Sequence, residues 1–521
     1  MQPQRHGPRH KPASGTRKQF EERRNDHYKV AMKLDSIIQD SGCVITSGNG
    51  GIEISAICCD SRKVIHGSLF VAVKGFASDG HDYISAAIGK GAVAVVYEDQ
   101  ENAERQIETS GKDDIVMIKA ESARYALAII AANFYDNPSR KLTLVGITGT
   151  NGKTTTVTLL HRMFTSIGYS CGMLSTIANY VGEKSTEAVN TTSDPLTINS
   201  LLNEMVQAGC GFCFMEVSSI GVEQERVAGL EFKVGIFSNL THDHLDYHKT
   251  FAEYLRCKKL FFDNLGSQAY AITNIDDRNG MVMVQNTKAK VVTYSCRKLA
   301  DHRCRIIEQS YEGMLLRIDE RETWSCLIGM HNAYNLLAIY TTAITLGADT
   351  QEALVALSSL RPAPGRLENI RGPRDISVII DYAHTPDALE NVLGTLRAIA
   401  PDRELICLFG CGGDRDKTKR PEMAAIAQKL ADRIIVTSDN SRTEKTADIM
   451  ADIKAGMDTA GRAKSLFIED REEAIRTAVM IAGQGATILL AGKGHETYQI
   501  IGTEKKHFDE KEIVNGIFES L

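Results

Sequence analysis

A short turn between an apolar run and a helical pattern has the residues needed to hold phosphate. The stretch GITGTNGKTTT follows the strand-like LTLV and precedes the helical VTLLHRMF. Gly149 and Gly152 allow backbone N–H groups to approach phosphate oxygens, and Lys153 can reach the β- and γ-phosphates of a nucleotide. Thr154 can offer its hydroxyl to Mg²⁺. The pattern therefore predicts a phosphate-binding loop between a strand and a helix.

The loop departs from the strict nucleotide-binding pattern at one position. Ile147 stands where that pattern has its first glycine, five residues before Gly152. Many unrelated functions use such a loop, so alone it leaves open a ligase, a P-loop switch and a binding ATPase. A switch would hydrolyse ATP alone, whereas a ligase would need its co-substrates.

Acidic and imidazole side chains follow two further strand-like runs. Glu216 ends the run in MEVSS, and the stretch NLTHDHLDYH packs three histidines and two aspartates into seven positions: His242, Asp243, His244, Asp246 and His248. Mg²⁺ is usually held by few carboxylates together with phosphates and water. Glu216 and one of these histidines near Thr154 would supply such a site. Zinc is the alternative, but neither a cysteine nor a helical H-x-x-x-H spacing supports it.

The elements that must position these residues alternate along the chain between strand-like and helical patterns. A length of 521 residues predicts two to four domains. The hydrophobic fraction of 43% is that of an ordinary globular protein. We expect an N-terminal α/β domain over 32–140, a central domain with a parallel sheet over 141–360, and a Rossmann-like domain over 361–521. Residues 1–31 are polar and basic without apolar periodicity, which is typical of a disordered tail.

Charge, cysteine usage and hydropathy indicate which partners and which cellular compartment to expect. The net charge of −6 argues against non-specific nucleic-acid binding. No apolar run approaches a membrane span, and the N-terminus lacks a signal-peptide pattern. The twelve cysteines are scattered, and the one close pair, CGFC at 210–213, leads into a strand and is interpreted as a buried structural pair. Unpaired thiols at this density indicate the cytoplasm.

The order of the motifs resembles that of the Mur ligases over about residues 32 to 515. After DSRKVIHGSLFVAVKG and TGTNGKTTT come NTTSDPL, MEVSS, NLTHDHLDYH, GMHNAYN, PGRLENI, DYAHTPDAL, FGCGGDRDKTKRP, DNSRTE and GKGHETYQ. The resemblance implies a three-domain α/β fold, with a central P-loop ATPase-like domain and a C-terminal Rossmann-like domain. A dinucleotide site at GCGGDR is excluded, because Arg415 takes the place of the third glycine.

The resemblance is to the branch of the family that forms a tripeptide, and it implies an ATP-driven amide ligation in peptidoglycan precursor synthesis. The D-glutamyl γ-carboxylate of UDP-MurNAc-L-Ala-D-Glu would take the γ-phosphoryl group of ATP, and a diamino acid would then displace phosphate. Implied cofactors are ATP, Mg²⁺ and a carbamylated lysine formed from CO₂. The implied protein is a monomer that binds small molecules and no nucleic acid.

The resemblance also implies roles for individual residues. The catalytic residues would be Lys153, His244 and Lys258, and the metal ligands would be Thr154, Glu216, His244 and Lys258 as its carbamate. ATP would be held by Gly149, Thr150, Asn151, Gly152, Lys153, Thr154, Thr155, Asn332, Arg366 and Asp381, with His384 approaching the nucleotide. The UDP-MurNAc-dipeptide would be held by Ser61, Asn190, Thr191, Thr192, Ser218, Gln224 and Arg226. Ile220 departs from the family pattern, which usually has histidine there, and GFAS at 75–78 lacks a polar neighbour for the uridine.

The diamino acid is expected to be meso-2,6-diaminopimelate, with L-lysine as the alternative. The extra carboxylate of diaminopimelate calls for a cation, best a guanidinium fork. Its site would comprise Arg415, Asp439, Asn440, Ser441, Arg442, Gly492 and Glu496. Relatives that add diaminopimelate typically read DNPR and GKGHE, and Ser441 here replaces the proline, which would loosen the loop. A folylpolyglutamate synthase is a further alternative, but it is not expected to contain the DSR or DNSR motifs.

Overall fold

A computed structural model describes residues 31–75, 78–112, 114–241 and 245–521. The described chain forms two compact units, one ending at Asp136 and one spanning Asn137–Leu521, and each is considered by itself. The predicted tail lies outside the described residues through position 30. The three-domain division at 140 and 360 stays a prediction.

The first unit is a five-stranded sheet with helices packed on it. The strands run in the order β2-β7-β6-β5-β4, parallel except for β2. The strands are β1 (Met32–Lys33), β2 (Val44–Ser47), β3 (Glu53–Ile54), β4 (Ala56–Cys58), β5 (Ser68–Val71), β6 (Ala92–Tyr97) and β7 (Val116–Lys119). The helices are α2 (Leu34–Ile37), α3 (Ile84–Gly89), α4 (Gln100–Ser110) and α5 (Ala123–Phe134), with short 3₁₀ turns η1 (Ser61–Lys63) and η2 (Gly80–Tyr83).

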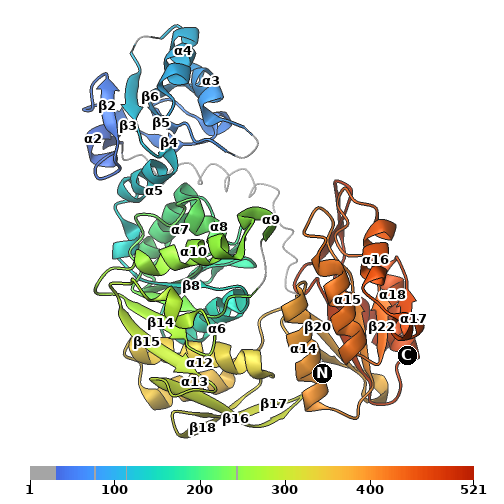
Figure 1. The fold of residues 1–521 in the computed structure, drawn as a ribbon. Coiled ribbons are helices and arrows are strands. Elements are labelled where there is room, and N and C mark those ends of the chain that lie inside the picture. The colour runs from blue at the N-terminus through green and yellow to red at the C-terminus, as the bar shows by residue number, and fades with distance from the viewer. Residues whose placement is uncertain (1–30, 76–77, 113, 242–244) are drawn as a thin grey trace, which may run out of the picture. The chain divides into compact units, whose positions relative to one another are not determined.

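An eleven-stranded sheet forms the larger part of the second unit (Figure 1). Its order is β11-β10-β9-β12-β8-β13-β14-β15-β16-β17-β18. The seven neighbouring strands that begin with β9 and end with β16 in this order are parallel. The strands are β8 (Thr143–Thr148), β9 (Cys171–Leu174), β10 (Ala178–Val181), β11 (Lys184–Glu187), β12 (Phe212–Glu216), β13 (Val234–Phe237), β14 (Tyr270–Asn274), β15 (Lys290–Ser295), β16 (His302–Ser310), β17 (Gly313–Ile318) and β18 (Arg321–Ser325). The sequence predicted the parallel centre, but not the antiparallel additions at both edges.

Helices cover both faces of this sheet because its central strands are apolar on both sides. Side chains of α6, α12 and α13 form one core layer, and those of α7 and α10 form the other. The helices are α6 (Lys153–Ser166), α7 (Pro195–Gln207), α8 (Ser219–Glu223), α9 (Leu245–His248), α10 (Phe251–Asp263), α11 (Gly280–Met283), α12 (Met330–Thr345) and α13 (Thr350–Ser359), and the turn η3 (Pro138–Arg140) precedes β8. Asp194 and Thr250 cap α7 and α10 by accepting hydrogen bonds from backbone N–H groups.

The remainder of the second unit is a six-stranded sheet with the order β19-β20-β24-β21-β22-β23, in which only β19 is antiparallel. The strands are β19 (Glu368–Arg371), β20 (Ser377–Asp381), β21 (Leu405–Phe409), β22 (Arg433–Val436), β23 (Ser465–Phe467) and β24 (Thr487–Ala491), followed by the hairpin β25 (Tyr498–Ile501) and β26 (Glu504–His507). The helices are α14 (Pro386–Ile399), α15 (Lys419–Leu430), α16 (Thr446–Ala455), α17 (Thr459–Ala463), α18 (Arg471–Ile481) and α19 (Glu510–Glu519), and η4 (Pro373–Asp375) is a 3₁₀ turn.

Two core layers sandwich this smaller sheet. Side chains of α14, α15 and α16 pack on one face, and those of α18 and α19 pack on the other. Because the strands are parallel, the loops after β20, β21, β22 and β24 all leave the same edge. These loops contain DYAH, GCGGDR, DNSR and GKGHE, so the fold gathers four separate motifs at one edge.

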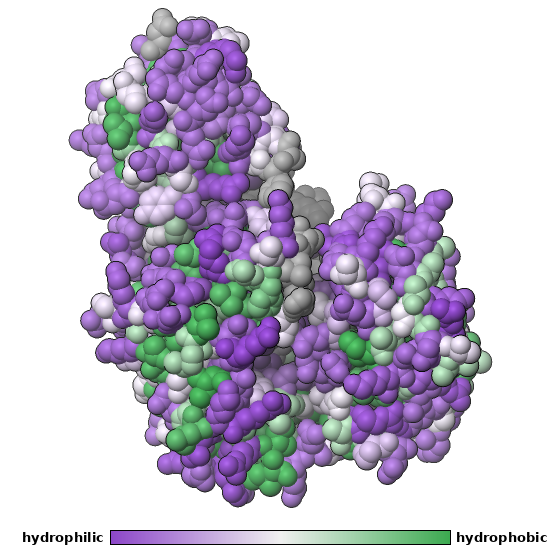
Figure 2. All heavy atoms as spheres, in the orientation of Figure 1, coloured by the Kyte–Doolittle hydropathy of each residue, from purple (hydrophilic) through white to green (hydrophobic). Residues whose placement is uncertain are grey.

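The face drawn in Figure 2 is mostly hydrophilic, and the burial of the CGFC pair agrees with the sequence prediction. The exposed hydrophobic residues on that face form small separate patches. All twelve cysteines are free thiols, and Cys210 and Cys213 are buried. Burial raises the pKa of Cys213 well above its usual range, which fits a structural residue. Across the described residues no helix is both long and apolar enough to span a bilayer.

Candidate active site

The phosphate-binding loop connects β8 to α6 in a conformation that requires glycine. Gly149 has a φ of +154°, and a Cβ there would lie 1.9 Å from the Ser238 hydroxyl. Gly152 has a φ of +87° and directly precedes α6. The Lys153 amine donates to the carbonyls of Gly149 and Thr150, both at 2.9 Å. The loop is therefore curled around its own lysine at the N-terminal end of a helix, where anions are favoured.

Lys258 reaches the same loop from α10. Its side chain is 1% exposed, its Nζ donates to the Gly149 carbonyl at 2.9 Å, and it lies 4.6 Å from the centre of the Tyr254 ring. The neighbouring Lys259 points elsewhere and forms an ion pair with Asp263 at 2.6 Å. Adjacent helical positions are about 100° apart, so only one of the two lysines can face the loop.

Glu216 ends β12, next to β8, and its carboxylate is completely buried. Oε1 accepts the Thr176 backbone N–H at 2.8 Å, while Oε2 is buried without a partner among the described residues. A buried, unpartnered carboxylate oxygen beside a phosphate loop fits Mg²⁺, which prefers oxygen ligands. The described residues contain no cluster of three metal-ligating side chains. His244 lies outside the described residues.

One cavity of about 370 Å³ brings these groups together. It is lined by most of the phosphate loop and by Thr154, Glu216 and Lys258, and also by Asn190, Thr191, Thr192, Ser218 and Arg226. The separate motifs TGTNGKTTT, NTTSDPL, MEVSS and EYLRCKK thus meet at one place. Ile220, the departure from the family pattern, also lines the cavity.

A hydrogen-bond network fixes the wall formed by NTTSDPL. The Thr192 hydroxyl donates to the Glu216 carbonyl at 2.9 Å and accepts the Ser218 N–H at 3.0 Å. Arg226 donates to the Thr192 carbonyl at 2.6 Å and to Gln224 Oε1. Glu216, Thr192 and Arg226 are therefore held as one group. Ser61 begins η1 in the first unit, half-buried.

A second cavity of about 300 Å³ lies beyond Gly152 and Thr155 and is also lined by Asn332, Arg366 and Asp381, all predicted nucleotide contacts. Burial raises the pKa of Asp381, and the nearby Arg366 acts in the opposite direction. Arg366 lies over the Tyr382 ring at 4.7 Å and lines both cavities. His384 lines the first cavity only.

Sequence reasoning missed Asp276 and Tyr334, which also line this second cavity. The Tyr334 hydroxyl donates to Asp276 Oδ2 at 2.8 Å, and Asp276 also accepts from the Ser295 hydroxyl and the Arg297 N–H. Burial works against ionisation, but these hydrogen bonds lower the pKa of Asp276. The sequence gives little indication that Asp276 belongs to the site, because this residue follows a strand within NIDDRNG, which is an ordinary turn sequence.

The residues predicted to bind the diamino acid lie on loops after β21, β22 and β24. A Cβ on Gly412 would lie 3.0 Å from Arg442 NH1 and 3.9 Å from Arg415 Cγ, so both guanidinium-bearing chains approach this glycine. Arg442 NH1 donates to the Gly413 carbonyl at 2.8 Å. Arg442 adopts a φ of +49°, and Ser441 is 2% exposed.

Glu496 lies at the other end of this group and already has a cationic partner. Its Oε2 accepts from Asn440 Nδ2 at 2.8 Å and from the Lys493 amine at 3.2 Å. Lys493 is completely buried and also donates to Asn440 Oδ1 at 3.3 Å. The sequence analysis did not single out Lys493. On Gly492, with a φ of +116°, a Cβ would lie 2.6 Å from Asp439 Oδ2.

Comparison with known proteins agrees with this geometry. Three family descriptions match consecutive parts of the chain: "Mur ligase family, catalytic domain" at 53–135, "Mur ligase middle domain" at 147–343 and "Mur ligase, glutamate ligase domain" at 365–494. A UDP-N-acetylmuramoyl-L-alanyl-D-glutamate–2,6-diaminopimelate ligase of Cytophaga hutchinsonii is 48% identical over 94% of this chain and its own full length. Its counterpart in Bacteroides fragilis is also 48% identical, over 94% of this chain and 99% of its own.

A solved structure of a ligase with the same name superposes with a TM-score of 0.67 at 30% identity, covering 94% of this chain and 99% of the other. The chain belongs to the Mur ligase family. It is therefore a ligase, of a family that uses ATP and Mg²⁺ and acts on small molecules.

Proposed function

We propose that this chain joins meso-2,6-diaminopimelate to the D-glutamyl γ-carboxylate of UDP-MurNAc-L-Ala-D-Glu in peptidoglycan precursor synthesis, as a cytoplasmic monomer. The observation that carries the proposal is the single cavity in which Lys153, Glu216 and Lys258 face Thr192 and Arg226. A phosphate site and a polar peptide site open into the same space. Relatives with this printed activity are 48% identical over 94% of the chain.

The proposed reaction makes a poor electrophile reactive in two steps. A γ-carboxylate oxygen attacks the γ-phosphorus of ATP, and ADP leaves with the bond electrons. The neutral amine of the diamino acid then attacks the acyl carbon and loses a proton, and inorganic phosphate leaves with the electrons of the C–O bond. Both steps need positioning and charge neutralisation rather than a protein nucleophile.

Lys153 and the backbone N–H groups of the loop would neutralise charge on the β- and γ-phosphates. Mg²⁺, held by Glu216, Thr154 and His244, would supply further neutralisation of phosphate charge. Arg226, fixed by Thr192 and Gln224, would orient the peptide carboxylate. Closure of the cavity by Arg366 and His384 would exclude water from the acyl phosphate.

Lys258 would act as its carbamate, formed from CO₂ and the neutral amine. The reaction releases one proton, and the product, –NζH–COO⁻, keeps one N–H, which could still donate to the Gly149 carbonyl that Nζ contacts now. The new carboxylate would then face the γ-phosphate region as a ligand for a second Mg²⁺. Lys258 is 1% exposed. Burial disfavours the charged form of an amine, and the neutral amine is the form that reacts with CO₂.

Two features favour diaminopimelate over L-lysine. Arg442 bonds only through NH1 to described residues, so the rest of its guanidinium fork is available for a carboxylate. Arg415, at the same glycine, adds a second cation. L-Lysine has no distal carboxylate to compensate these charges. A folylpolyglutamate synthase activity is disfavoured because such an enzyme is not expected to contain the DSR and DNSR motifs that this chain has.

The test is product analysis with a panel of diamino acids. Purified protein is incubated with ATP, Mg²⁺, UDP-MurNAc-L-Ala-D-Glu and each of meso-diaminopimelate, L-lysine and L-ornithine, and products are read by mass spectrometry. The proposal expects a tripeptide product with diaminopimelate and ADP release only when both co-substrates are present. Absence of the diaminopimelate product, or equal ADP release from ATP alone, would reject it.

A further inference from the structure

A buried arginine in the C-terminal part of the second unit bonds to two loops of the proposed diamino-acid site. Arg471 is 1% exposed and is the first residue of α18. Its NH1 donates to the Ser438 carbonyl at 3.0 Å, and its NH2 donates to the Ala491 carbonyl at 2.9 Å. Glu510, the first residue of α19, accepts from Nε at 2.8 Å.

The two carbonyls belong to strands that are not neighbours. Ser438 follows β22 and directly precedes the residues 439–442, whereas Ala491 ends β24 and directly precedes the residues 492–496. β21 lies between these strands in the sheet. The guanidinium of Arg471 therefore connects two strands that are separated by a third. It fixes the starting points of both loops relative to each other.

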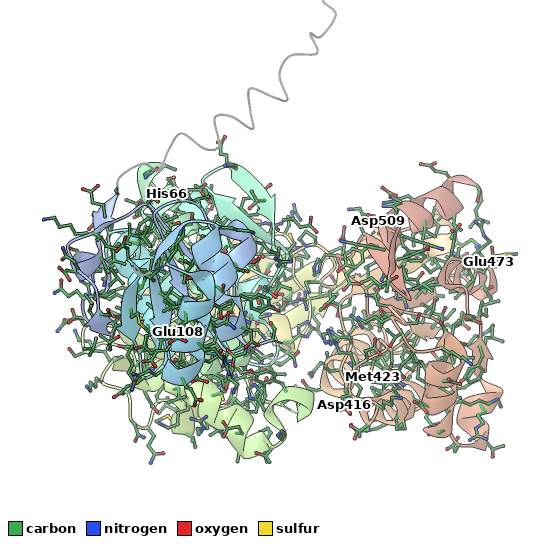
Figure 3. The ribbon with its side chains drawn as sticks, turned by 90° about the horizontal axis from the view of Figure 1, so that it is seen from above. His66, Glu108, Asp416, Met423, Glu473 and Asp509 are labelled. Carbon is green, nitrogen blue, oxygen red and sulfur yellow. The ribbon has the colours of Figure 1, made fainter. Side chains whose placement is uncertain are left out.

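Figure 3 helps to locate the two helices that supply this pair. Glu473, in the first turn of α18, and Asp509, the residue that caps α19, are both labelled in the C-terminal part of the second unit. The buried charges in the first turns of these helices are those of Arg471 and Glu510. Neither Arg471 nor Glu510 lines any cavity described above, so neither is placed to touch a substrate.

Burying the Arg471–Glu510 ion pair in the core costs desolvation free energy. Both side chains are almost fully buried, and Glu510 Oε2 has no partner among the described residues. Burial raises the pKa of Glu510, against the opposing effect of Arg471. Buried ion pairs add little stability over well-packed apolar residues, but they can fix one conformation. Geometric control of the two loops is a function that apolar residues could not provide.

The loop 438–442 is also held from β25, which strengthens this interpretation. Gln499 Nε2 donates to the Ser438 hydroxyl and to the Asp439 carbonyl at 2.9 and 3.1 Å. The Ile500 N–H donates to Asn440 Oδ1 at 2.8 Å. With these contacts on one side and Arg471 on the other, the position of Asn440, and through it Glu496, depends on where Arg471 holds Ser438.

We infer that Arg471 and Glu510 are positioning residues for the diamino-acid site: they set the separation of the loops that present Arg442 and Glu496. The inference rests on the proposed function. Neither residue is part of the ATP site, so their loss should change binding of the diamino acid and leave binding of ATP intact.

The test compares Arg471→Lys and Glu510→Gln with the unmodified protein. Lysine keeps the charge but cannot reach two carbonyls and a carboxylate in one plane. We expect KM for meso-diaminopimelate to rise at least about tenfold in Arg471→Lys, since small misplacements of binding groups are costly. KM for ATP should stay within about twofold on the same argument. Arg374→Lys is the control for the loss of a two-carbonyl contact, because Arg374, an exposed residue, bonds the carbonyls of Val479 and Ala482 at the other end of α18.

Hydrogen exchange measured by mass spectrometry provides a readout that does not depend on the substrate. Exchange should rise in the peptides containing 438–442 and 492–496 in both variants, and not in Arg374→Lys. An unchanged KM with unchanged exchange in folded variants overturns the inference, as does a parallel rise of KM for ATP. If Arg471→Lys does not fold, Glu510→Gln decides by the same criteria. If neither folds, the pair serves stability alone and the inference fails. Failure of the unmodified protein to use diaminopimelate would instead reject the proposed function, and the exchange result would still stand.

Discussion

The Lys258 amine lies 2.9 Å from the carbonyl oxygen of Gly149, the first glycine of the phosphate-binding loop. The two residues are 109 positions apart in the chain. The contact places a buried amine against the loop that is proposed to hold the γ-phosphate, and Lys153 donates to the same carbonyl. Lys258 lines the same cavity as Glu216.

Lys258→Ala is expected to reduce ligase activity almost completely, because the variant cannot form the proposed carbamate. Formate or acetate should partly restore the rate by supplying a carboxylate in the vacated space. The measurement is phosphate release with and without added acid. Lys259→Ala is the control, since Lys259 pairs with Asp263 outside the cavity. Normal turnover in Lys258→Ala would refute the assignment.

Glu216→Gln is expected to lower kcat/KM by about 100-fold, the size of losing one well-placed electrostatic contact in an active site. The amide keeps the shape and can still accept the Thr176 N–H, but it lacks the charge that Mg²⁺ requires. Activity is measured against Mg²⁺ concentration, and part of the loss should be recovered at high Mg²⁺. A curve that coincides with that of the unmodified protein would show that Oε2 faces no metal.

Arg442→Ala is expected to lower kcat/KM for meso-diaminopimelate by roughly 30-fold or more, since losing one partner of a buried charge pair costs about 2–5 kcal/mol. KM for ATP should change little. Steady-state kinetics with L-lysine provide the comparison, because lysine has no distal carboxylate to lose a contact. Comparable kcat/KM values for the two amino acids in the unmodified enzyme would overturn the choice of diaminopimelate.

A chain that begins at Met32 is expected to keep full activity and its melting temperature, because residues 1–31 have no apolar pattern to bury. A chain that begins at Gln39 is the control. It loses Leu34 and Ile37, both completely buried, and so should melt earlier. A large drop in kcat or melting temperature on starting at Met32 would mean that the removed segment packs on the protein.

The stability of the second unit should depend on His495 between about pH 4 and 6.5. Burial and the nearby Arg366 lower the pKa of His495 to about 4. Below the ordinary pKa near 6.5 the unfolded chain takes up a proton that the folded chain refuses, so stability falls as the pH falls through this window. The contribution is up to about 3 kcal/mol.

His495→Gln removes this titration. Urea unfolding followed by circular dichroism from pH 7 to pH 5 should show the unmodified protein losing stability faster than the variant, so that the two curves converge. Curves that stay parallel over the whole range would contradict the lowered pKa. Carboxyl groups that titrate in the same range affect both proteins equally and cancel in the difference.

The sequence by itself determined most of the elements, and it predicted which residues belong to the site. Buried strands such as β8, β12, β20 and β24 are apolar runs ended by Gly, Asp or Glu, and their chain order matched the family. Gly149 and Gly152 could be identified because a tight turn before a helix needs positive φ. These are local signals, readable over a few residues.

Only the tertiary structure decided which polar groups meet. Nothing local marks Asp276 or Arg471 as different from the other charged residues of the chain, and Lys493 is marked only by lying in the GKGHE motif. The contacts of all three follow from burial and from partners distant in sequence. The choice between Lys258 and Lys259 likewise depends on how α10 is rotated against the sheet. Packing fixes that rotation, and packing involves the whole core at once.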